Sequence, residues 1–296
     1  MYDQVEIAFS PQSLLLLNAI LGFMMFGVSL QLSPADFIRV LKAPRAPIAG
    51  LLAQFLLLPA ATGLLTWWFA VEPSLALGMI LVASCPGGTF SNVMTWLAKA
   101  SVPVSVSMTA VSSLAAMVMT PFNFAFWGNL NPHTREMMRE IAIDPINMVM
   151  LVLLVLVVPM ILGMLIGRRF PVLVERSDKP MRIFALSVFF MFVIVAVVNN
   201  VDVFIEHALS VSVLVVLHNL LAFSVGALSA KAMKLPTADR RAVTIEVGIQ
   251  NSALALSILF TFFGGAGGML LIAALWGVWH LISGLTLALI WSRSEA

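Results

Sequence analysis

The sequence predicts an all-α membrane protein with nine transmembrane helices in inverted repeats, two of the helices being broken. Three observations predict this: the composition, the apolar windows and the placement of basic residues. Of the 296 residues, 61% are hydrophobic and 10% are charged, whereas about 25% of residues in soluble domains are charged. The single cysteine excludes a disulfide scaffold, and a net charge of +2 gives no reason to expect nucleic acid as a partner. We therefore expect the protein to be embedded in a lipid bilayer.

Nine apolar windows are each long enough to cross a bilayer, since a helical span needs roughly 20 such residues. Only the eighth contains an acidic or basic residue, Glu246. No basic residue precedes the first window, so we expect a retained span and no cleaved signal peptide. The windows are 13–32, 46–70, 74–98, 102–128, 145–167, 183–201, 208–230, 242–263 and 267–291.

The connections between these windows differ strongly in basic charge. Of the 16 Lys and Arg residues, all but Arg135 and Arg139 fall on one side of the membrane when the nine windows alternate. Connections rich in Lys and Arg remain cytoplasmic. We therefore expect a cell-membrane protein with its amino terminus outside and its carboxyl terminus in the cytoplasm.

The order of the spans allows an internal symmetry. Four spans precede the fifth and four follow it, so the second set enters the membrane in the opposite sense. We expect a first repeat over residues 1–141, a connecting helix and loop over 142–182, and an inverted repeat over 183–296. Transporters built this way bind substrate near the membrane midplane, at interrupted helices.

The third window is interrupted at residues 85–88, which read Cys-Pro-Gly-Gly. Proline removes a backbone N–H and glycine weakens a helix. The polar residues Thr89, Ser91 and Asn92 follow. A second half-helix starting there would present N–H groups suited to an anion. The alternative is a buried proline kink without a binding role.

The eighth window carries a polar run, and we expect a second break at residues 246–252. Such side chains are costly in lipid and mark ion or substrate pathways. In the alternative interpretation, Glu246 is an interfacial carboxylate paired with Arg240 or Arg241. The run consists of Glu246, Gly248, Gln250, Asn251 and Ser252.

Further oxygen atoms lie in other windows. Ser105 and Thr109 are spaced to share one helix face, although such hydroxyls often bond to a carbonyl four residues back. Gln54 lies in the second window and His218-Asn219 in the matching seventh. The simpler interpretation of each of these polar side chains is an interhelical hydrogen bond. Because hard cations take oxygen ligands, the set as a whole suggests a Na⁺ site.

Three strings, at 25–37, 85–98 and 244–256, resemble the bile acid:sodium symporter family. The resemblance implies a sodium-dependent organic anion transporter of the bacterial type. It further implies five-plus-five inverted repeats, a core and a panel domain, and two broken helices that cross in the core.

The resemblance also implies two sites for co-transported Na⁺ and a neighbouring site for a small organic anion, bile-acid-like, pantoate-like or another carboxylate, in a monomer. The first sodium site would use Ser91, Asn92, Ser105, Thr109 and Glu246. The second would use Gln54, Glu246 and Gln250 with the backbone carbonyls of Val247 and Ile249. The substrate would contact Thr89, the amide of Phe90, Asn251 and His280.

Some features depart from the family pattern. Bacterial members commonly have ten spans rather than nine, and Phe90 and Leu281 replace a small and a polar residue. Two related carriers remain alternatives: a metalloid efflux carrier that uses Cys85, and a sodium/proton antiporter, which usually needs a second membrane carboxylate. No motif of an intramembrane enzyme occurs within a span, so we expect no enzymatic activity.

Overall fold

The computed structural model describes residues 11–88, 90–141, 144–172, 201–263 and 266–293, with scattered positions between 174 and 198. Thr89 and most of the expected span at 183–201 lie outside the described residues. Within them, all regular elements are helices, and the β-type pairing they contain is one isolated antiparallel bridge. Five helices are long and apolar enough to cross a membrane: Arg45–Trp68, Val102–Leu130, Ile146–Arg169, Ser210–Ala232 and Gly267–Ser292.

The helices follow the apolar windows closely, and two of the continuous spans contain a π-helical turn (η). In chain order they are α1 (Pro11–Ser29), α2 (Pro34–Lys42), α3 (Arg45–Leu52), η2 (Ala53–Leu57), α4 (Leu58–Trp68), α5 (Pro73–Ser84), α6 (Ser91–Leu97), α7 (Val102–Leu130), α8 (Arg135–Ile141), α9 (Pro145–Val152), η3 (Leu153–Val157), α10 (Val158–Arg169), α12 (Val201–Ala232), α13 (Thr237–Gly248), α14 (Ser252–Phe262) and α15 (Gly267–Ser292). The count of nine spans stays a prediction.

Two short helices, α2 and α8, lie in connections where no helix was expected. The start of α2 is fixed by Asp36, whose carboxylate accepts hydrogen bonds from the backbone N–H of Ser33 at 2.8 Å and from Arg39 at 2.9 Å. Both helices are too short and too charged for a search based on apolar windows. Local capping, rather than apolar length, produces α2.

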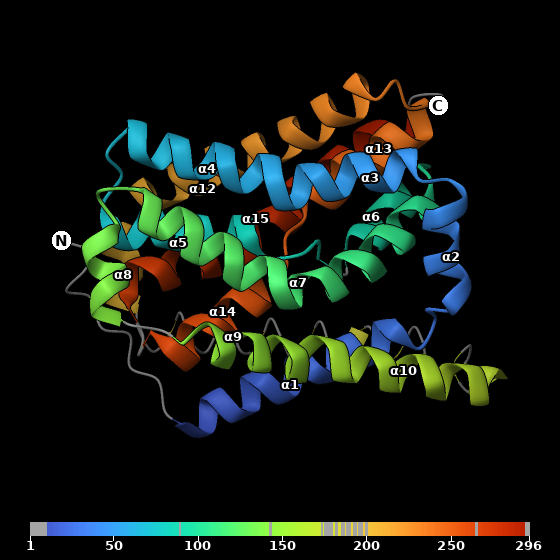
Figure 1. Ribbon diagram of the computed structural model, residues 1–296, viewed down its shortest axis with the longest axis horizontal. Helices are drawn as coiled ribbons and strands as arrows, with labels where there is room; N and C mark the ends of the chain where they lie inside the picture. The colour runs from blue at the N-terminus through green and yellow to red at the C-terminus, as the bar shows by residue number, and fades with distance from the viewer. Residues whose placement is uncertain are drawn as a thin grey trace.

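The helices are arranged as a layer set against a larger bundle (Figure 1). Helix α1 packs along α10 and forms the layer with α9. The bundle contains α3 to α7 and α12 to α15, with α3, α4, α12 and α13 on the side away from the layer. The layer contacts the bundle through α14 and α7.

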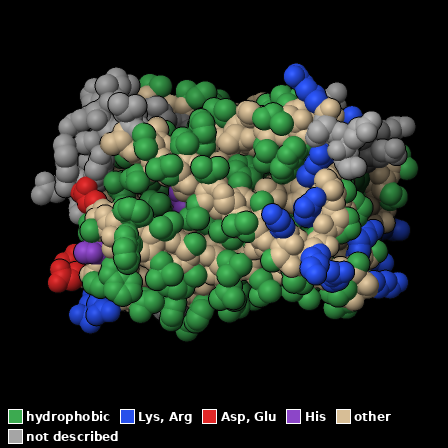
Figure 2. Space-filling model, turned by 90° about the horizontal axis from the view of Figure 1, so that it is seen from above, with side chains coloured by type: hydrophobic (Ala, Val, Ile, Leu, Met, Phe, Trp, Pro, Cys, Tyr) green, Lys and Arg blue, Asp and Glu red, His purple; other side chains and the backbone are tan. Residues whose placement is uncertain are grey.

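The two ends of the bundle differ in charge. Figure 2 shows most Lys and Arg side chains gathered at one end of the molecule, and acidic side chains with a smaller basic group at the other. At the basic end, Arg45 donates to the carbonyl of Met233 at 2.8 Å, joining the start of α3 to the turn after α12. Elsewhere, Asn131 donates to Thr66 at 3.3 Å, joining the carboxyl ends of α7 and α4.

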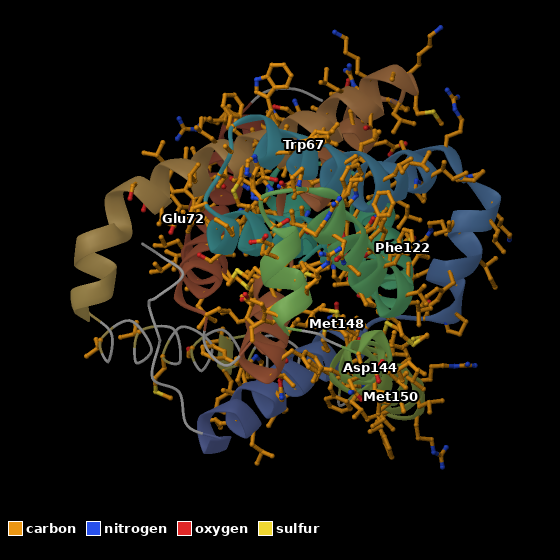
Figure 3. All side chains as sticks on the ribbon, turned by 60° about the vertical axis from the view of Figure 1, so that its left-hand side comes forward. Trp67, Glu72, Phe122, Asp144, Met148 and Met150 are labelled. Atoms are coloured by element: carbon orange, nitrogen blue, oxygen red, sulfur yellow. The ribbon has the colours of Figure 1, made fainter. Side chains whose placement is uncertain are left out.

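The surface between these ends is apolar. Trp67, Phe122 and Met150 are 44%, 56% and 53% exposed, whereas Met148, on the same helix as Met150, is 2% exposed (Figure 3). Large exposed apolar areas on a protein indicate contact with a partner or a membrane. Together with the spanning helices, this surface is that of a membrane protein.

Candidate functional site

Two helices are interrupted, and their breaks pair with each other. The first break separates α5 from α6, and the second separates α13 from α14. The N–H of Gly88 donates to the carbonyl of Ile249 at 2.5 Å, and the N–H of Asn251 donates to the carbonyl of Pro86 at 2.9 Å. Backbone groups freed inside a membrane must find protein partners. Here each break supplies partners for the other.

Glycine is required where the breaks meet. A Cβ on Gly87 would lie 2.5 Å from Oε1 of Glu246, and one on Gly88 would lie 2.8 Å from the carbonyl oxygen of Gln250. Contacts under 3.0 Å are too short for a carbon atom, so the backbones of Gly88 and Gln250 can approach this closely only because residue 88 has no side chain. The first interruption is therefore a true break with a partner, not a simple proline kink.

The second break is narrower than the sequence predicts. Helix α13 continues to Gly248, so Glu246 belongs to its last turn, and only residues 249–251 separate it from α14. Side-chain polarity indicates that a helix is interrupted but not at which residue it ends. Helix α13 ends shortly before Gln250, which forms the isolated bridge with Gly87.

Glu246 is 1% exposed and lies among hydroxyl groups. Its carboxylate accepts hydrogen bonds from Ser91 at 2.5 Å, Ser105 at 2.8 Å and Thr109 at 2.6 Å. These donors come from α6 and α7, so one side chain joins three helices. Hydrogen bonds to a charged acceptor are the stronger kind, which makes this cluster a firm contact between the two breaks and α7.

The basic residues near Glu246 have other partners. Arg240 donates to Thr237 at 3.1 Å, and Arg241 donates to the carbonyl of Trp291 at 3.3 Å with its guanidinium 5.6 Å from that ring's centre. The carboxylate lies within the helix assembly beside Gly87. The interfacial ion pair considered as an alternative does not describe this arrangement.

Asn92 extends the hydroxyl cluster. Its Oδ1 accepts hydrogen bonds from Ser105 at 2.8 Å and from Thr109 at 3.4 Å. Thr109 also donates to the carbonyl of Ser105 at 3.0 Å, and Ser107 donates to the carbonyl of Pro103 at 2.7 Å. The hydroxyl of Ser107 thus bonds to the carbonyl four residues back, as the alternative interpretation expected. The hydroxyl of Thr109 makes this bond and also contacts Asn92 and Glu246. All residues expected at the first sodium site lie in one network.

Two of the residues expected at the second site, Gln54 and Gln250, form an amide pair. Nε2 of Gln54 donates to Oε1 of Gln250 at 2.8 Å, and the reverse bond is 3.2 Å. Gln250 also donates to the carbonyl of Val247 at 2.7 Å, and Gln54 to that of Cys85 at 2.7 Å. Gln54 lies on η2, and π-helical turns are frequent at functional sites.

The residues expected to contact substrate are not gathered in one cavity. Asn251 caps α14 by accepting a hydrogen bond from the N–H of Leu254 at 3.0 Å. It also lines a cavity of about 20 Å³ between α1, η3 and α14, which is room for one water molecule. Phe90 and His280 do not line it, and Thr89 lies outside the described residues. His280 is buried, and its Nδ1 has no hydrogen-bond partner among the described residues.

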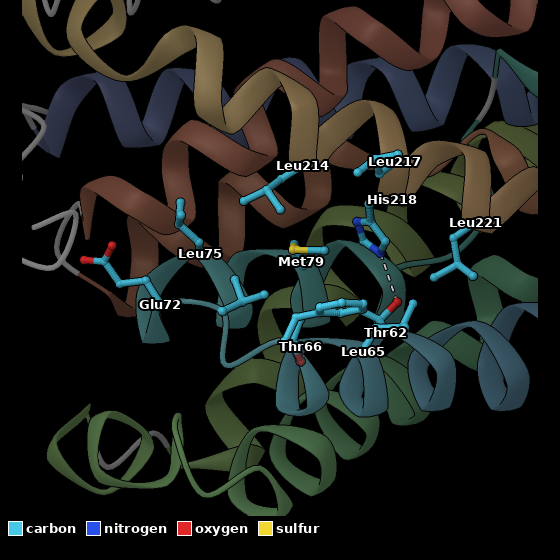
Figure 4. Close-up of a pocket in the computed structure, with 12 residues that line it drawn as sticks. Thr62, Leu65, Thr66, Glu72, Leu75, Met79, Leu214, Leu217, His218 and Leu221 are labelled. Atoms are coloured by element: carbon cyan, nitrogen blue, oxygen red, sulfur yellow. Dashed lines mark hydrogen bonds between the residues drawn. The ribbon is translucent and has the colours of Figure 1, made fainter.

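A larger cavity, of about 440 Å³, lies between α4, α5 and α12 (Figure 4). Most of its lining is apolar, and Thr62 and His218 point toward each other at 2.9 Å. Trp276 donates to Nδ1 of His218 at 3.0 Å, so the ring hydrogen is on Nε2. Nε2 therefore donates a hydrogen bond to the hydroxyl oxygen of Thr62. This cavity contains none of the site residues expected from the sequence.

Two asparagine contacts between helices were not anticipated. Asn123 of α7 donates to the carbonyl of Phe55 at 2.8 Å and so supports η2 beside Gln54. Asn18 of α1 accepts a hydrogen bond from Ser257 of α14, joining the layer to the bundle. An asparagine within an apolar window is the signal that could have found them.

Spanning helices with two interruptions that pair around a buried carboxylate define the discontinuous-helix class of membrane carriers. The model of the Sodium Bile acid symporter family matches residues 18–207, which is more than half of the chain. The chain therefore belongs to this family.

Several curated proteins are similar to the chain over most of its length. An uncharacterized sodium-dependent transporter, YocS, of Bacillus subtilis is 31% identical over 278 residues, 92% of this chain and 82% of that protein. A probable chloroplastic sodium/metabolite cotransporter, BASS1, of Arabidopsis thaliana is 30% identical over 91% of this chain and 65% of its own length. The human ileal sodium/bile acid cotransporter is 25% identical over 82% of this chain and 68% of that protein.

These findings settle the broad class of activity. The family and its named relatives are sodium-dependent transporters, so this chain is a membrane transporter and not an enzyme. The resemblance expected from the three sequence strings is confirmed.

Proposed function

We propose that this chain is a sodium-coupled symporter that imports a small organic anion by alternating access. The observation that carries the proposal is the buried carboxylate of Glu246, which touches the first break and α7 while belonging to the second broken helix. A buried charge is costly unless it is paired. Sodium entering here neutralises the carboxylate and links both breaks.

The first sodium ion takes its oxygens from Ser91, Asn92, Ser105, Thr109 and Glu246. All lie within one hydrogen-bonded cluster. A hydroxyl that donates to the carboxylate can turn its hydrogen away and offer a lone pair to a cation. Binding therefore needs rotation of hydroxyl hydrogens and little movement of oxygen atoms.

The second sodium ion takes its oxygens from Gln54, Glu246, Gln250 and the carbonyls of Val247 and Ile249. The amide pair of Gln54 and Gln250 must open to release them. Two sodium ions, one carboxylate and one bound anion sum to zero charge, which avoids a buried net charge. Import with this stoichiometry moves one positive charge inward.

The anion binds beside the crossing, at Asn251, with Thr89, the amide of Phe90 and His280 as further contacts. The cavity at Asn251 holds about 20 Å³ here, far below the roughly 300 Å³ of an ordinary ligand pocket. This conformation is therefore closed around the site. Admitting the anion requires the layer of α1, α9 and α10, the proposed panel, to move against the bundle, the proposed core.

The chain functions as a monomer in the cell membrane, with the amino terminus outside and the basic end of Figure 2 in the cytoplasm. The proposed repeats are 1–141 and 183–296, joined by 142–182. Bile-acid-like, pantoate-like and other small carboxylates are the substrate classes to test. Sodium couples reciprocally to the anion, so each raises the affinity for the other.

The test is a thermal-shift screen of small organic anions with the purified protein in sodium chloride or in choline chloride. An anion that raises the melting temperature only with sodium, and is then taken up by proteoliposomes under an inward sodium gradient, supports the proposal. Stabilisation that is equal in the two salts for every anion bound would contradict it.

A separate experiment tests the efflux alternative. Cys85 is fully buried, and it is its backbone carbonyl that accepts a hydrogen bond from Gln54. We expect Cys85→Ala to retain sodium-driven uptake within about twofold, or about 0.4 kcal/mol, because the backbone carbonyl that Gln54 contacts is kept in the variant. Loss of uptake in this variant would favour a carrier that uses the thiol.

A further inference from the structure

One face of α12 lies against the last turn of α13, directly before the second break. This face carries Asn219, Phe223 and Gly226, which are spaced to lie on one side of a helix. A Cβ on Gly248 would lie 2.1 Å from Cδ1 of Phe223, and one on Gly226 would lie 3.0 Å from Cβ of Val247. The two helices are thus in close contact where α13 ends.

Asn219 completes the hydrogen bonding of that helix end. It is 1% exposed, and its Nδ2 donates to the carbonyl of Gly248 at 2.9 Å. Gly248 is the last residue of α13, and the last carbonyls of a helix lack donors from a following turn. The side chain of Asn219 replaces the donor that an unbroken helix would supply.

Ser283 of α15 fixes the direction of this amide. Its hydroxyl donates to Oδ1 of Asn219 at 2.6 Å. In an asparagine the oxygen only accepts and the nitrogen only donates. Because Ser283 holds the oxygen, the nitrogen is directed at Gly248.

The position of Gly248 gives this contact a consequence for ion binding. Gly248 lies between Val247 and Ile249, whose carbonyls belong to the proposed second sodium site. Since peptide units are rigid planes, holding one carbonyl restrains the planes on either side. We propose that Asn219, oriented by Ser283, is a positioning residue for the second sodium site and holds the carbonyls of Val247 and Ile249 toward the ion. This inference rests on the proposed function.

The test is a sodium titration of the full-length purified protein, in which the melting temperature is measured at each sodium concentration. Choline chloride keeps the ionic strength constant. Removing a residue that orients metal ligands typically costs 10–100-fold in affinity. We expect Asn219→Ala to raise the half-saturating sodium concentration by about tenfold, with Ser283→Ala giving a smaller rise. Asn219→Asp keeps the acceptor for Ser283 but directs a carboxylate oxygen at the carbonyl of Gly248, so we expect a larger rise.

The matched control is Asn129→Ala. Asn129 also donates its amide to a backbone carbonyl, that of Ala125 at 2.8 Å, but it is exposed and within one helix. We expect its half-saturating sodium concentration to equal that of the unmodified protein.

The outcomes separate this inference from the function on which it rests. If the unmodified protein responds to sodium and Asn219→Ala melts lower but keeps the same half-saturation, Asn219 is structural only and the inference is overturned. An unchanged half-saturation in Ser283→Ala overturns it as well, which covers a failure of the Asn219 variants to fold. If the unmodified protein responds equally to sodium and choline, the proposed function itself fails.

Discussion

The two candidate sodium sites share Glu246 but differ in what engages their oxygen atoms. At the first, three hydroxyls donate to the carboxylate at 2.5 to 2.8 Å. At the second, Gln54 and Gln250 bond to each other, and Gln250 also donates to the carbonyl of Val247 at 2.7 Å. A hydroxyl frees its oxygen by rotating a hydrogen, whereas an amide must turn as a whole.

If the proposed sites are correct, this difference indicates how one carboxylate could serve two ions. The first site would be assembled before sodium arrives, and the second would form only when the amide pair opens. We infer that the first ion binds first and that the second binding step carries the conformational change. Variants that damage both sites, the second site alone or the first site alone distinguish the contributions of the two sites.

The largest effect is expected from Glu246→Gln, which removes the charge common to both sites while keeping the side chain's size. We expect sodium-driven uptake in proteoliposomes to fall to background, because neither ion is then balanced by a carboxylate. Glu72→Gln, a change at the start of α5, is the control and should transport normally. Uptake at the unmodified rate in Glu246→Gln would show that sodium binding does not need this carboxylate.

Gly87→Ala should damage both sites by displacing the carboxylate of Glu246. The added Cβ would lie 2.5 Å from Oε1 and 3.1 Å from Cδ of Glu246, so the carboxylate must shift away from its hydroxyl donors. Overpacking of this kind costs about 1–3 kcal/mol, and we expect a lower melting temperature together with lost uptake. Gly22→Ala is the control, because its Cβ would meet Cγ of Pro159 at an ordinary 3.5 Å. Equal behaviour of the two variants would mean that the exact position of the Glu246 carboxylate does not matter.

Gln250→Ala should affect the second site alone. We expect the sodium dependence of uptake to change from sigmoidal to hyperbolic and the half-saturating concentration to rise about tenfold, as for a lost or disordered ligand. Initial uptake rates over a range of sodium concentrations measure both. A curve that stays sigmoidal would place the second ion elsewhere.

The smallest effect is expected from Ser105→Ala, which removes one of several oxygens at the first site. A hydrogen bond to a charged group contributes about 1.5–3 kcal/mol, but neighbouring donors remain. We expect the half-saturating sodium concentration to rise a few-fold. Ser107→Ala is the matched control, since Ser107 bonds to the carbonyl of Pro103 in its own helix. If both variants behave alike, the hydroxyl cluster does not bind the ion.

The helix breaks could be predicted from the sequence because their causes are local. Pro86 and the glycines after it interrupt a helix. A carboxylate such as Glu246 within an apolar window is too costly to face lipid, so it marks a functional position. The resemblance to the symporter family then grouped the oxygen-bearing residues. The structure shows two hydrogen-bonded groups among these residues, one around Glu246 and one formed by Gln54 and Gln250. Their role as ligands is a proposal.

Other features depend on contacts between distant segments and could not be predicted. Ser105 and Ser107 are the same residue type in one window, yet only Ser105 reaches Glu246, because residues two apart face different sides of a helix. The bond from Asn219 to Gly248 and its support by Ser283 require knowing which helices are neighbours. The bridge between Gly87 and Gln250, shortly after the end of α13, likewise joins segments far apart in the sequence.

Counting bound sodium tests the central claim most directly, because it asks whether a single carboxylate supports both ions. Equilibrium binding of radioactive sodium to the purified protein would be measured for the unmodified chain, Gln250→Ala and Glu246→Gln. We expect two ions, one ion and none, respectively. A full complement of bound sodium in Glu246→Gln would show that neither ion needs this carboxylate.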